Sequence, residues 1–258
     1  MRRRDCLVAP ACLSWLAGCG EPSQKIAITA ILGGVAVDPA GKVVPNSVIL
    51  VAGSRLQSVG SDTDVIVPPG SMSWSANDRF VVPAPVELPP DMTIVRLASP
   101  SDVMKASIKA PEVLEGTVSD AGELPEELVR SLATSGTIVV PRLARLAQTP
   151  ARLARGLANV KRFIASGIRL ASFGDKDSLA EWRLLAQAGL TPRQVLESAT
   201  VHAAIVVRQR DTAGALRPGF LANLWVLRLD PLANTDHLAS VDAIMREGVW
   251  QRSAGAAN

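Results

Sequence analysis

The sequence predicts an α/β protein whose β-rich ends bracket a centre of alternating strands and helices. Short apolar runs alternate with turn residues between residues 26 and 82, and again from residue 214 onward. Between residues 125 and 207, buried strand patterns alternate with amphipathic helix patterns. With 258 residues, of which 48% are hydrophobic, the chain is long enough to form one large domain or two modest ones, each with a buried core. The economical interpretation is a small β domain built from both ends of the chain, with an α/β domain inserted into it.

Runs of apolar residues with the length of strands mark both ends of the chain. In the N-terminal part they lie at residues 26–32, 48–51, 65–67 and 80–82, and in the C-terminal part at residues 222–229 and 241–245. Turn sequences separate them, namely Asp38-Pro39-Ala40-Gly41, Gly53-Ser54, Pro68-Pro69-Gly70 and Glu247-Gly248. We therefore expect a composite β domain from residues 26–80 and 210–252.

The central region carries helix start and stop signals around buried strands. Pro125 opens an amphipathic helix with acids in its first turn, which ends near Gly136. Strands are predicted at residues 137–140 and 167–171, and helices at residues 142–163, interrupted at Pro150, and 179–188. Thr191 provides an N-cap, with proline at the first helical position and a capping-box glutamine, for a helix to about residue 207.

The first nineteen residues have the organisation of an export signal. Three arginines after Met1 precede an apolar run over residues 6–17 that is too short to span a bilayer. The run ends in Leu16-Ala17-Gly18-Cys19, which resembles the bacterial lipobox, whose cysteine becomes the lipid-bearing first residue. We therefore expect a signal peptide over residues 1–18, a tether over residues 19–25, and a protein anchored to the cell envelope through lipid on Cys19. The alternative is a buried cysteine in an apolar N-terminal helix, against which Asp5 and Pro10 count.

Charge and aromatic content argue against a nucleic-acid-binding protein. The net charge is +3, but three arginines and one aspartate lie in the expected leader, so the mature chain carries about +1. Aromatic residues make up only 3% of the chain and tyrosine is absent, which leaves few stacking platforms. All three cysteines fall within the first nineteen residues, so the mature chain would retain only Cys19 and could form no internal disulfide.

Several motifs in consistent order resemble the amidohydrolase superfamily, specifically its imidazolonepropionase-like branch of metal-dependent hydrolases. They are Ala188-Gly189-Leu190-Thr191-Pro192 followed by Ala199-Thr200, Gly214-Ala215-Leu216-Arg217-Pro218-Gly219, Ala222-Asn223-Leu224, Asp230-Pro231 and the lead-in Val81-Val82-Pro83. The resemblance covers residues 26–90 and 112–250. It implies that the α/β part is a partial (β/α) barrel inserted in the composite β domain, with strands at residues 81–86, 113–115, 137–140 and 168–171.

The resemblance also locates the family's catalytic positions, and most of them are altered. Those enzymes hold one or two divalent metals, such as zinc, at the C-terminal mouth of the barrel, and an aspartate after the last strand handles the proton of the metal-bound water. The histidine positions fall on Pro89, Asp91 and Gly116, none of which is a histidine. Only the last-strand aspartate is matched, by Asp175. We therefore predict no metal or other cofactor, with Asp175 either a vestigial catalytic residue or an acid stabilised at a helix N-terminus.

The predicted barrel domain, residues 81–209, is about half the length of a full barrel of about 250 residues. Two hypotheses follow. The chain is a degenerate amidohydrolase relative that acts as a scaffold or binding module, or it hydrolyses cyclic amides or dipeptide-like bonds with a site around Asp91, Glu115 and Asp175. A short parallel sheet would also leave apolar faces and edges uncovered, so we expect self-association or a protein partner.

Three further features have a structural and a functional interpretation. His202 is predicted to be a partly buried helix residue rather than a metal ligand, and His237 a solvated loop residue. The basic residues of the stretch 142–162 predict the solvated face of a helix that covers the barrel, with contact to anionic lipid as the alternative.

Overall fold

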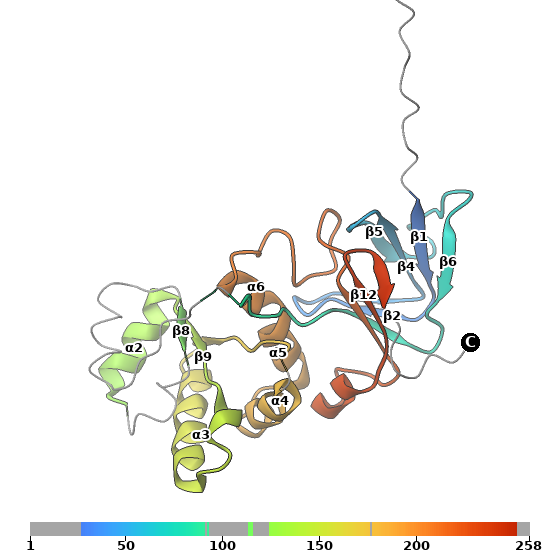
Figure 1. Cartoon of the computed structure of the whole chain (residues 1–258). Coiled ribbons are helices and arrows are strands. Elements are labelled where there is room, and N and C mark those ends of the chain that lie inside the picture. Colours follow the sequence, from blue (N-terminus) through green and yellow to red (C-terminus); the bar gives the residue numbers. More distant parts are fainter. Residues whose placement is uncertain (1–26, 91, 93–112, 116–123, 176, 252–258) are drawn as a thin grey trace, which may run out of the picture.

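The computed structural model describes residues 27–90, 92, 113–115, 124–175 and 177–251, and within these ranges it contains three β-sheets. The expected leader, tether and Cys19 therefore lie outside the described residues, as do Asp91 and Gly116. Figure 1 shows the β-rich part and the helical part side by side.

The first sheet, called here the outer sheet, contains four strands in the order β5-β4-β1-β6. Its strands are β1 Ile28–Leu32, β4 Ser47–Ala52, β5 Arg55–Ser61 and β6 Met72–Ser75. Strand β1 is antiparallel to β4 and parallel to β6, and Thr29 lies opposite Met72. The start of the described chain and the start of β6 therefore lie at the same end of this sheet.

The second sheet, called here the composite sheet, contains six strands in the order β13-β12-β11-β7-β2-β3. Its strands are β2 Val35–Val37, β3 Val43–Pro45, β7 Phe80–Pro83, β11 Leu224–Leu227, β12 Val241–Arg246 and β13 Val249–Gln251. Strand β7 lies between β2 and β11, so it joins strands from the two ends of the sequence.

The outer and composite sheets pack face to face. Ile31 and Ile49 of the outer sheet share a buried cluster with Val81, Leu224 and Val226 of the composite sheet. At one edge the β12–β13 turn meets the β4–β5 turn so closely that a Cβ on Gly248 would lie 1.9 Å from the carbonyl oxygen of Gly53. Gly248 also has a φ of 80°, so glycine is needed there for two independent reasons.

The third sheet, called here the parallel sheet, contains β8 Val113–Glu115, β9 Ile138–Val140 and β10 Arg169–Leu170, with β9 in the middle. The helices that follow or cover these strands are α2 Glu126–Ser135, the 3-10 turn η2 Leu143–Leu146, α3 Pro150–Ala165, α4 Ser178–Gln187, α5 Pro192–Glu197, the π-helical turn η3 Ser198–His202, α6 Ala203–Val206 and the 3-10 turn η4 Thr235–Ala239. No helix in the described ranges has both the length and the apolar character needed to cross a membrane.

The strand predicted at residues 81–86 differs from the expectation. Phe80–Pro83 pairs within the composite sheet instead of the parallel sheet. Only the next few residues approach the parallel sheet, where the Val86 carbonyl accepts a hydrogen bond from the Gly174 amide, 2.9 Å away. The physical reason is that β11 pairs with all four residues of Phe80–Pro83 and β2 with two of them, whereas Ala84 and Val86 make only isolated backbone hydrogen bonds outside the sheets.

Both faces of β9 are covered by the chain itself. Val139 joins a cluster with Phe163 of α3 and Leu185 of α4, whereas Ile138 and Val140 pack with Ala203 and Ala204 of α6. The exposed faces that led us to expect self-association are therefore not observed for this strand. Association with a second copy stays a prediction.

The other face of the composite sheet packs against the helical part. Val82 and Leu227 belong to the same buried cluster as Leu185 and Val195 of α4 and α5. The molecule is therefore layered, with the outer sheet, the composite sheet and the helices in succession. In α3, Val160 and Phe163 are buried while Arg152 and Arg155 are exposed, as the structural interpretation of the basic stretch predicts. The prediction is wrong for Arg142, which precedes α3 and has a side chain that is only 13% exposed because it pairs with Asp175.

Candidate functional site

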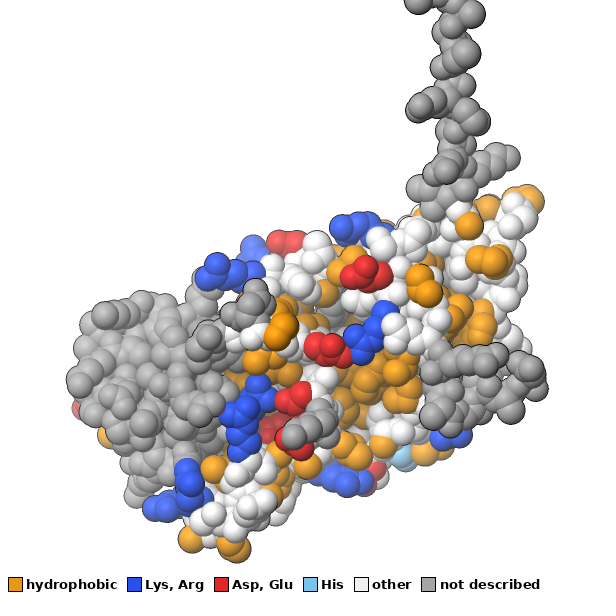
Figure 2. All heavy atoms as spheres, viewed as in Figure 1, with side chains coloured by type: hydrophobic (Ala, Val, Ile, Leu, Met, Phe, Trp, Pro, Cys, Tyr) orange, Lys and Arg blue, Asp and Glu red, His pale blue; other side chains and the backbone are white. Residues whose placement is uncertain are grey.

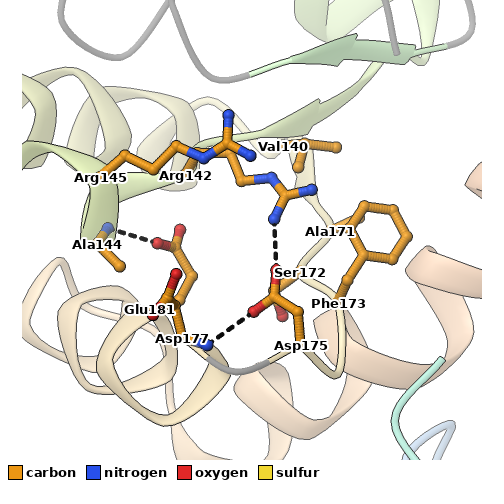
Figure 3. Close-up of a pocket in the computed structure, with 10 residues that line it drawn as sticks. All are labelled: Val140, Arg142, Ala144, Arg145, Ala171, Ser172, Phe173, Asp175, Asp177 and Glu181. Atoms are coloured by element: carbon orange, nitrogen blue, oxygen red, sulfur yellow. Dashed lines mark hydrogen bonds and ion pairs between the residues drawn. The ribbon is translucent and has the colours of Figure 1, made fainter. Parts of the chain in front are cut away.

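A pocket of about 150 Å³ lies beyond the carboxyl ends of β9 and β10. Ten residues line it, namely Val140, Arg142, Ala144, Arg145, Ala171, Ser172, Phe173, Asp175, Asp177 and Glu181. Figure 3 shows two arginines on one side and three carboxylates on the other. The pocket therefore carries both signs of charge on a lining that also includes apolar side chains.

Arg142 and Asp175 face each other across this pocket. The Arg142 Nη1 donates to Asp175 Oδ2 at 2.7 Å, and the guanidinium carbon lies 5.4 Å from the centre of the Phe173 ring (Figure 3). The other oxygen of Asp175 accepts a hydrogen bond from the Asp177 amide at 3.1 Å. Both carboxylate oxygens of Asp175 therefore have donors, one of them a permanently charged guanidinium.

The backbone at Arg142 is unusual and explains how the arginine reaches Asp175. Its φ is 51° and ψ is 39°, the left-handed conformation that few non-glycine residues adopt. This residue joins the end of β9 to η2. The turn directs the Arg142 side chain into the pocket, where only 13% of it is exposed, in contrast to 40% for Asp175.

Glu181 is the buried acid of the pocket. It lies in the first turn of α4, and its Oε2 accepts a hydrogen bond from the Ala144 amide at 2.7 Å (Figure 3). Burial raises the pKa of the Glu181 carboxyl, and hydrogen bonds from the amides of Ala144 and Leu143 offset part of that effect. The side chain therefore connects α4 to the start of η2, since it supplies an acceptor for an amide at that helix end.

A chain of buried hydrogen bonds holds Ser172, one of the residues that line the pocket. The indole of Trp182 donates to Ser172 Oγ at 3.1 Å, and the Ser198 hydroxyl donates to the Val195 carbonyl at 2.7 Å. The two serine oxygens are 3.0 Å apart. Because the Ser198 hydrogen is directed at Val195, Ser172 must donate to Ser198. Ser172 is therefore committed to the core, although its residue lines the pocket.

The pocket fits a divalent metal poorly. Within the described ranges, no three His, Cys, Asp or Glu side chains gather closely enough to hold a metal ion. Zinc sites use neutral imidazole or thiolate ligands, whereas here a guanidinium is paired with Asp175, the carboxylate that the sequence resemblance singled out. Pro89, which the resemblance aligns with a metal-binding histidine, has no donor atom in its side chain.

The two histidines lie outside this pocket. His202 Nδ1 is 2.8 Å from the Leu170 carbonyl, and burial lowers the pKa of its imidazole, which confirms the prediction of a partly buried helix residue. The prediction for His237 is wrong. It belongs to η4, is half-buried, and its Nδ1 lies 2.7 Å from the Asp230 carbonyl because the 3-10 turn folds back on that loop.

Sequence reasoning located one residue of the pocket and missed two. Asp175 is in the pocket, while Glu115 belongs to β8, whose side chains are outside the description. Arg142 was included only in the basic stretch of residues 142–162, and the signal that could have identified it is its position just after the buried strand Ile138–Val140. Glu181 could have been found as the one acid beside Trp182 and Leu185, which form the buried side of α4.

A mixed α/β protein with a pocket beyond the carboxyl ends of parallel strands has the arrangement in which α/β folds usually bind their ligands. The family comparison is more specific, since residues 99–250 match the model described as the amidohydrolase family. This match spans more than half of the sequence, and the chain belongs to that family.

Solved structures agree with this assignment at the level of the fold. A structure of molinate hydrolase has a TM-score of 0.73 at 11% identity, with 91% of this chain and 100% of that chain covered. Ochratoxinase of A. niger has a TM-score of 0.73 at 12% identity, with 90% and 97% covered. A Xaa-Pro dipeptidase with methionine bound in its active site has a TM-score of 0.71 at 11% identity, with 88% and 100% covered. No curated protein sequence matches the chain.

Proposed function

We propose that this protein is a lipid-anchored member of the amidohydrolase family that binds a small ligand in the Arg142–Asp175 pocket and has lost metal-dependent hydrolysis. In this proposal the barrel is shortened and the chain acts as a binding module or scaffold in the cell envelope. The observation that carries it is the 2.7 Å ion pair between Arg142 and Asp175.

The ion pair opposes the proton-handling role that the family resemblance gives to Asp175, and it also opposes binding of a metal beside this carboxylate. A proton acceptor has to present a lone pair to the reacting water, whereas the hydrogen bonds from Arg142 to Oδ2 and from the Asp177 amide to Oδ1 fix the orientation of the Asp175 carboxylate. A guanidinium beside the carboxylate also repels a second cation by Coulomb interaction. The pocket therefore supports recognition of charge better than acidification of water.

The size and charge of the pocket indicate the class of ligand. Its volume of about 150 Å³ suits a molecule of amino-acid size, since drug-sized ligands usually occupy about 300–1,000 Å³. Arginine can bind a carboxylate of the ligand, and Asp177 and Glu181 can bind an ammonium or amide group. A small zwitterion or amide is the ligand that uses both sides.

The test of the catalytic part uses the purified mature protein, its metal content and its hydrolysis of hydantoins, lactams and dipeptides. We expect no stoichiometric zinc, no turnover above background, and no effect of Asp175→Asn beyond a small change in stability. Zinc at one equivalent by elemental analysis, or turnover that Asp175→Asn abolishes, would reject the proposal.

The binding part is tested by isothermal titration with free amino acids and small amides. Arg142→Ala should weaken binding, whereas Arg155→Ala, an exposed arginine on α3, serves as the matched control and should leave it unchanged. Equal affinity of the two variants would place the ligand elsewhere.

The lipid anchor is tested by cell fractionation. Cys19→Ala should move the protein from the membrane fraction to the soluble fraction, because the acyl chains supply stable anchoring. A variant that stays in the membrane fraction would contradict the lipobox interpretation.

The second candidate function is a hydrolase of cyclic amides or dipeptide-like C–N bonds with Asp91, Glu115 and Asp175 in its site. Family membership favours it, and the similar structures include a molinate hydrolase and a Xaa-Pro dipeptidase. The same zinc and turnover measurements separate the two candidates.

A further inference from the structure

A second pocket, of about 230 Å³, lies where the composite sheet meets the helical part. It shares no lining residue with the Arg142–Asp175 pocket, and we call it the junction pocket. Its lining includes one aromatic side chain, two carboxamides and an ion pair, namely Trp225, Asn223, Gln209, Arg246 and Glu87. We propose that the junction pocket binds one pyranose sugar ring, as a second site in addition to the Arg142–Asp175 pocket.

Strand register places three of these side chains on one face of the composite sheet. Leu224 of β11 lies opposite Met245 of β12, and both pack in the buried cluster that faces the outer sheet. Side chains alternate along a strand, so the next residues, Trp225 and Arg246, lie on the other face, and Trp225 packs there against the cluster of the helical part. Asn223, two residues before Trp225, lies on that face as well. The sheet therefore presents a ring, a guanidinium and a carboxamide to the junction pocket.

The segment Ala84–Glu87 forms another part of the lining. It leads from the end of β7 toward the parallel sheet, where the Val86 carbonyl accepts a hydrogen bond from the Gly174 amide at 2.9 Å. This hydrogen bond holds the segment in place beside the pocket. At the end of the segment, Glu87 Oε1 accepts a hydrogen bond from Nη2 of Arg246. The ion pair therefore links β12 to the segment that follows β7.

The charges of the lining favour a neutral ligand. Arg246 and Glu87 already neutralise each other, and their side chains are 48% and 55% exposed, while the remaining acid, Glu247, is exposed to solvent. Figure 2 shows acidic and basic side chains next to each other between the β-rich part and the helical part, beside hydrophobic ones. A charged ligand would compete with the ion pair. A hydroxyl group both donates and accepts, so it can bind the guanidinium or the carboxylate and leave the pair intact.

The two carboxamides supply groups that are free to bind a ligand. The backbone amide of Glu247 donates to the Asn223 side chain at 2.7 Å. Because a backbone amide is a donor, the atom that it meets must be Oδ1, so both hydrogens of Nδ2 remain for a ligand. The side chain of Gln209 makes no hydrogen bond to any residue that the structure describes. Each carboxamide can therefore bind a hydroxyl group of the same sugar ring.

Trp225 and the size of the pocket complete the fit to a sugar ring. The Trp225 ring is held by Trp182, with ring centroids 6.1 Å apart and an interplanar angle of 66°. The carbon-bound hydrogens of a pyranose form an apolar face, which can pack on an aromatic side chain while the hydroxyl groups reach polar partners. A volume of about 230 Å³ is below the range of about 300–1,000 Å³ for drug-sized ligands and suits a single ring.

The test is an NMR titration of the purified mature protein, labelled with ¹⁵N, with glucose, galactose and N-acetylglucosamine. We expect saturable shifts of the Trp225 indole N–H and of the Asn223 side-chain amide with at least one of these sugars. The indoles of Trp74 and Trp250 are internal controls. Their rings are 4.6 Å apart and pack in the cluster between the outer and composite sheets, on the other face from Trp225, so their signals should not move.

Three variants show which side chains bind the sugar. Asn223→Asp keeps the acceptor for the Glu247 amide and removes both Nδ2 donors, so it should raise the dissociation constant about tenfold. Asn234→Asp is the matched control, because Asn234 Oδ1 also accepts from a backbone amide, at 2.9 Å, and the residue lies outside the pocket. Gln209→Ala changes an exposed side chain and should weaken binding without loss of the fold. Dissociation constants equal to that of the wild type in both pocket variants would reject the proposal.

Three other outcomes would also overturn the proposal. Spectra without a shift at Trp225 up to the solubility limit of each sugar would exclude a sugar site. Shifts of the Ala144 amide in place of Trp225 would locate the sugar in the Arg142–Asp175 pocket. Shifts of Trp225 with acetate or glycine but with no sugar would identify a charged ligand that breaks the ion pair. The titration of Arg142→Ala with amino acids is a separate measurement, so failure of the junction pocket is distinguishable from failure of the first site.

Discussion

The hydrogen bond between Trp182 and Ser172 should be measurable as a coupling energy. Both side chains are 2% exposed, so a lost partner cannot be replaced by water without rearrangement. Ser172→Ala leaves the indole N–H buried without an acceptor, which costs about 1–3 kcal/mol in the free energy of unfolding. For a domain of this size that corresponds to a fall in Tm of about 2–4 °C for each kcal/mol.

The double-mutant cycle with Trp182→Phe separates the bond from the change in packing. Phenylalanine removes the N–H and part of the ring volume, so that variant alone loses about 2–3 kcal/mol. In the Trp182→Phe background no indole N–H is left without an acceptor. Ser172→Ala should therefore lower the free energy of unfolding by about 1–2 kcal/mol less than it does in the wild type.

Urea unfolding followed by circular dichroism, in the four proteins of the cycle, gives these free energies. Ser131→Ala is the control, because Ser131 is exposed on α2 and the same chemical change there should stay within about 0.5 kcal/mol. If the two single-variant losses simply add in the double variant, the hydrogen bond contributes nothing and the reasoning is refuted.

Three further predictions concern single positions. Glu181→Gln should flatten the pH dependence of the free energy of unfolding. Burial raises the pKa of Glu181, so its stabilising contribution in the wild type is fully present below the usual pKa of 4.5 and is lost as the pH rises through the raised pKa. Unfolding free energies of both proteins between pH 4 and pH 7 test this, and parallel curves would contradict it. Asp175→Asn should lower the free energy of unfolding by about 0.5–1 kcal/mol, because the ion pair with Arg142 is partly exposed, and a loss above about 2 kcal/mol by urea titration would show that the pair is worth more than its exposure suggests. Gly248→Ala should lower Tm by several degrees, because the added Cβ would clash with Gly53 and because alanine disfavours the left-handed conformation of residue 248. An unchanged Tm would mean that the two turns separate easily.

Much of the secondary structure was predictable because local signals and burial agree. The capping box at Thr191 is present with both of its hydrogen bonds, and the helix over residues 125–136 ends with a left-handed Gly136, as its sequence indicated. The strands at residues 113–115, 137–140 and 168–171 form the parallel sheet with small differences at their ends.

The remainder depended on contacts between distant parts of the chain. Phe80–Pro83 reads equally well as a barrel strand or as a strand of the composite sheet, and only pairing with β2 and β11 decides between them. The left-handed turn at Arg142 has no signal in its own residue type, because arginine does not favour that conformation. The sequence therefore identified Asp175 as a candidate site residue, but it did not identify Arg142, which forms the ion pair with Asp175.

The composite sheet has a consequence for the order in which the protein can fold. Its central strand β7 is made early in synthesis, but its neighbour β11 emerges only after the helical region has been completed. Until then β7 has an open edge on that side, and closing the long loop carries an entropic cost that slows folding. A chain whose synthesis ends before residue 224 would thus have an unpaired edge on β7, and such an edge is a template for aggregation. The composite sheet is therefore complete only once β11, β12 and β13 have been synthesised.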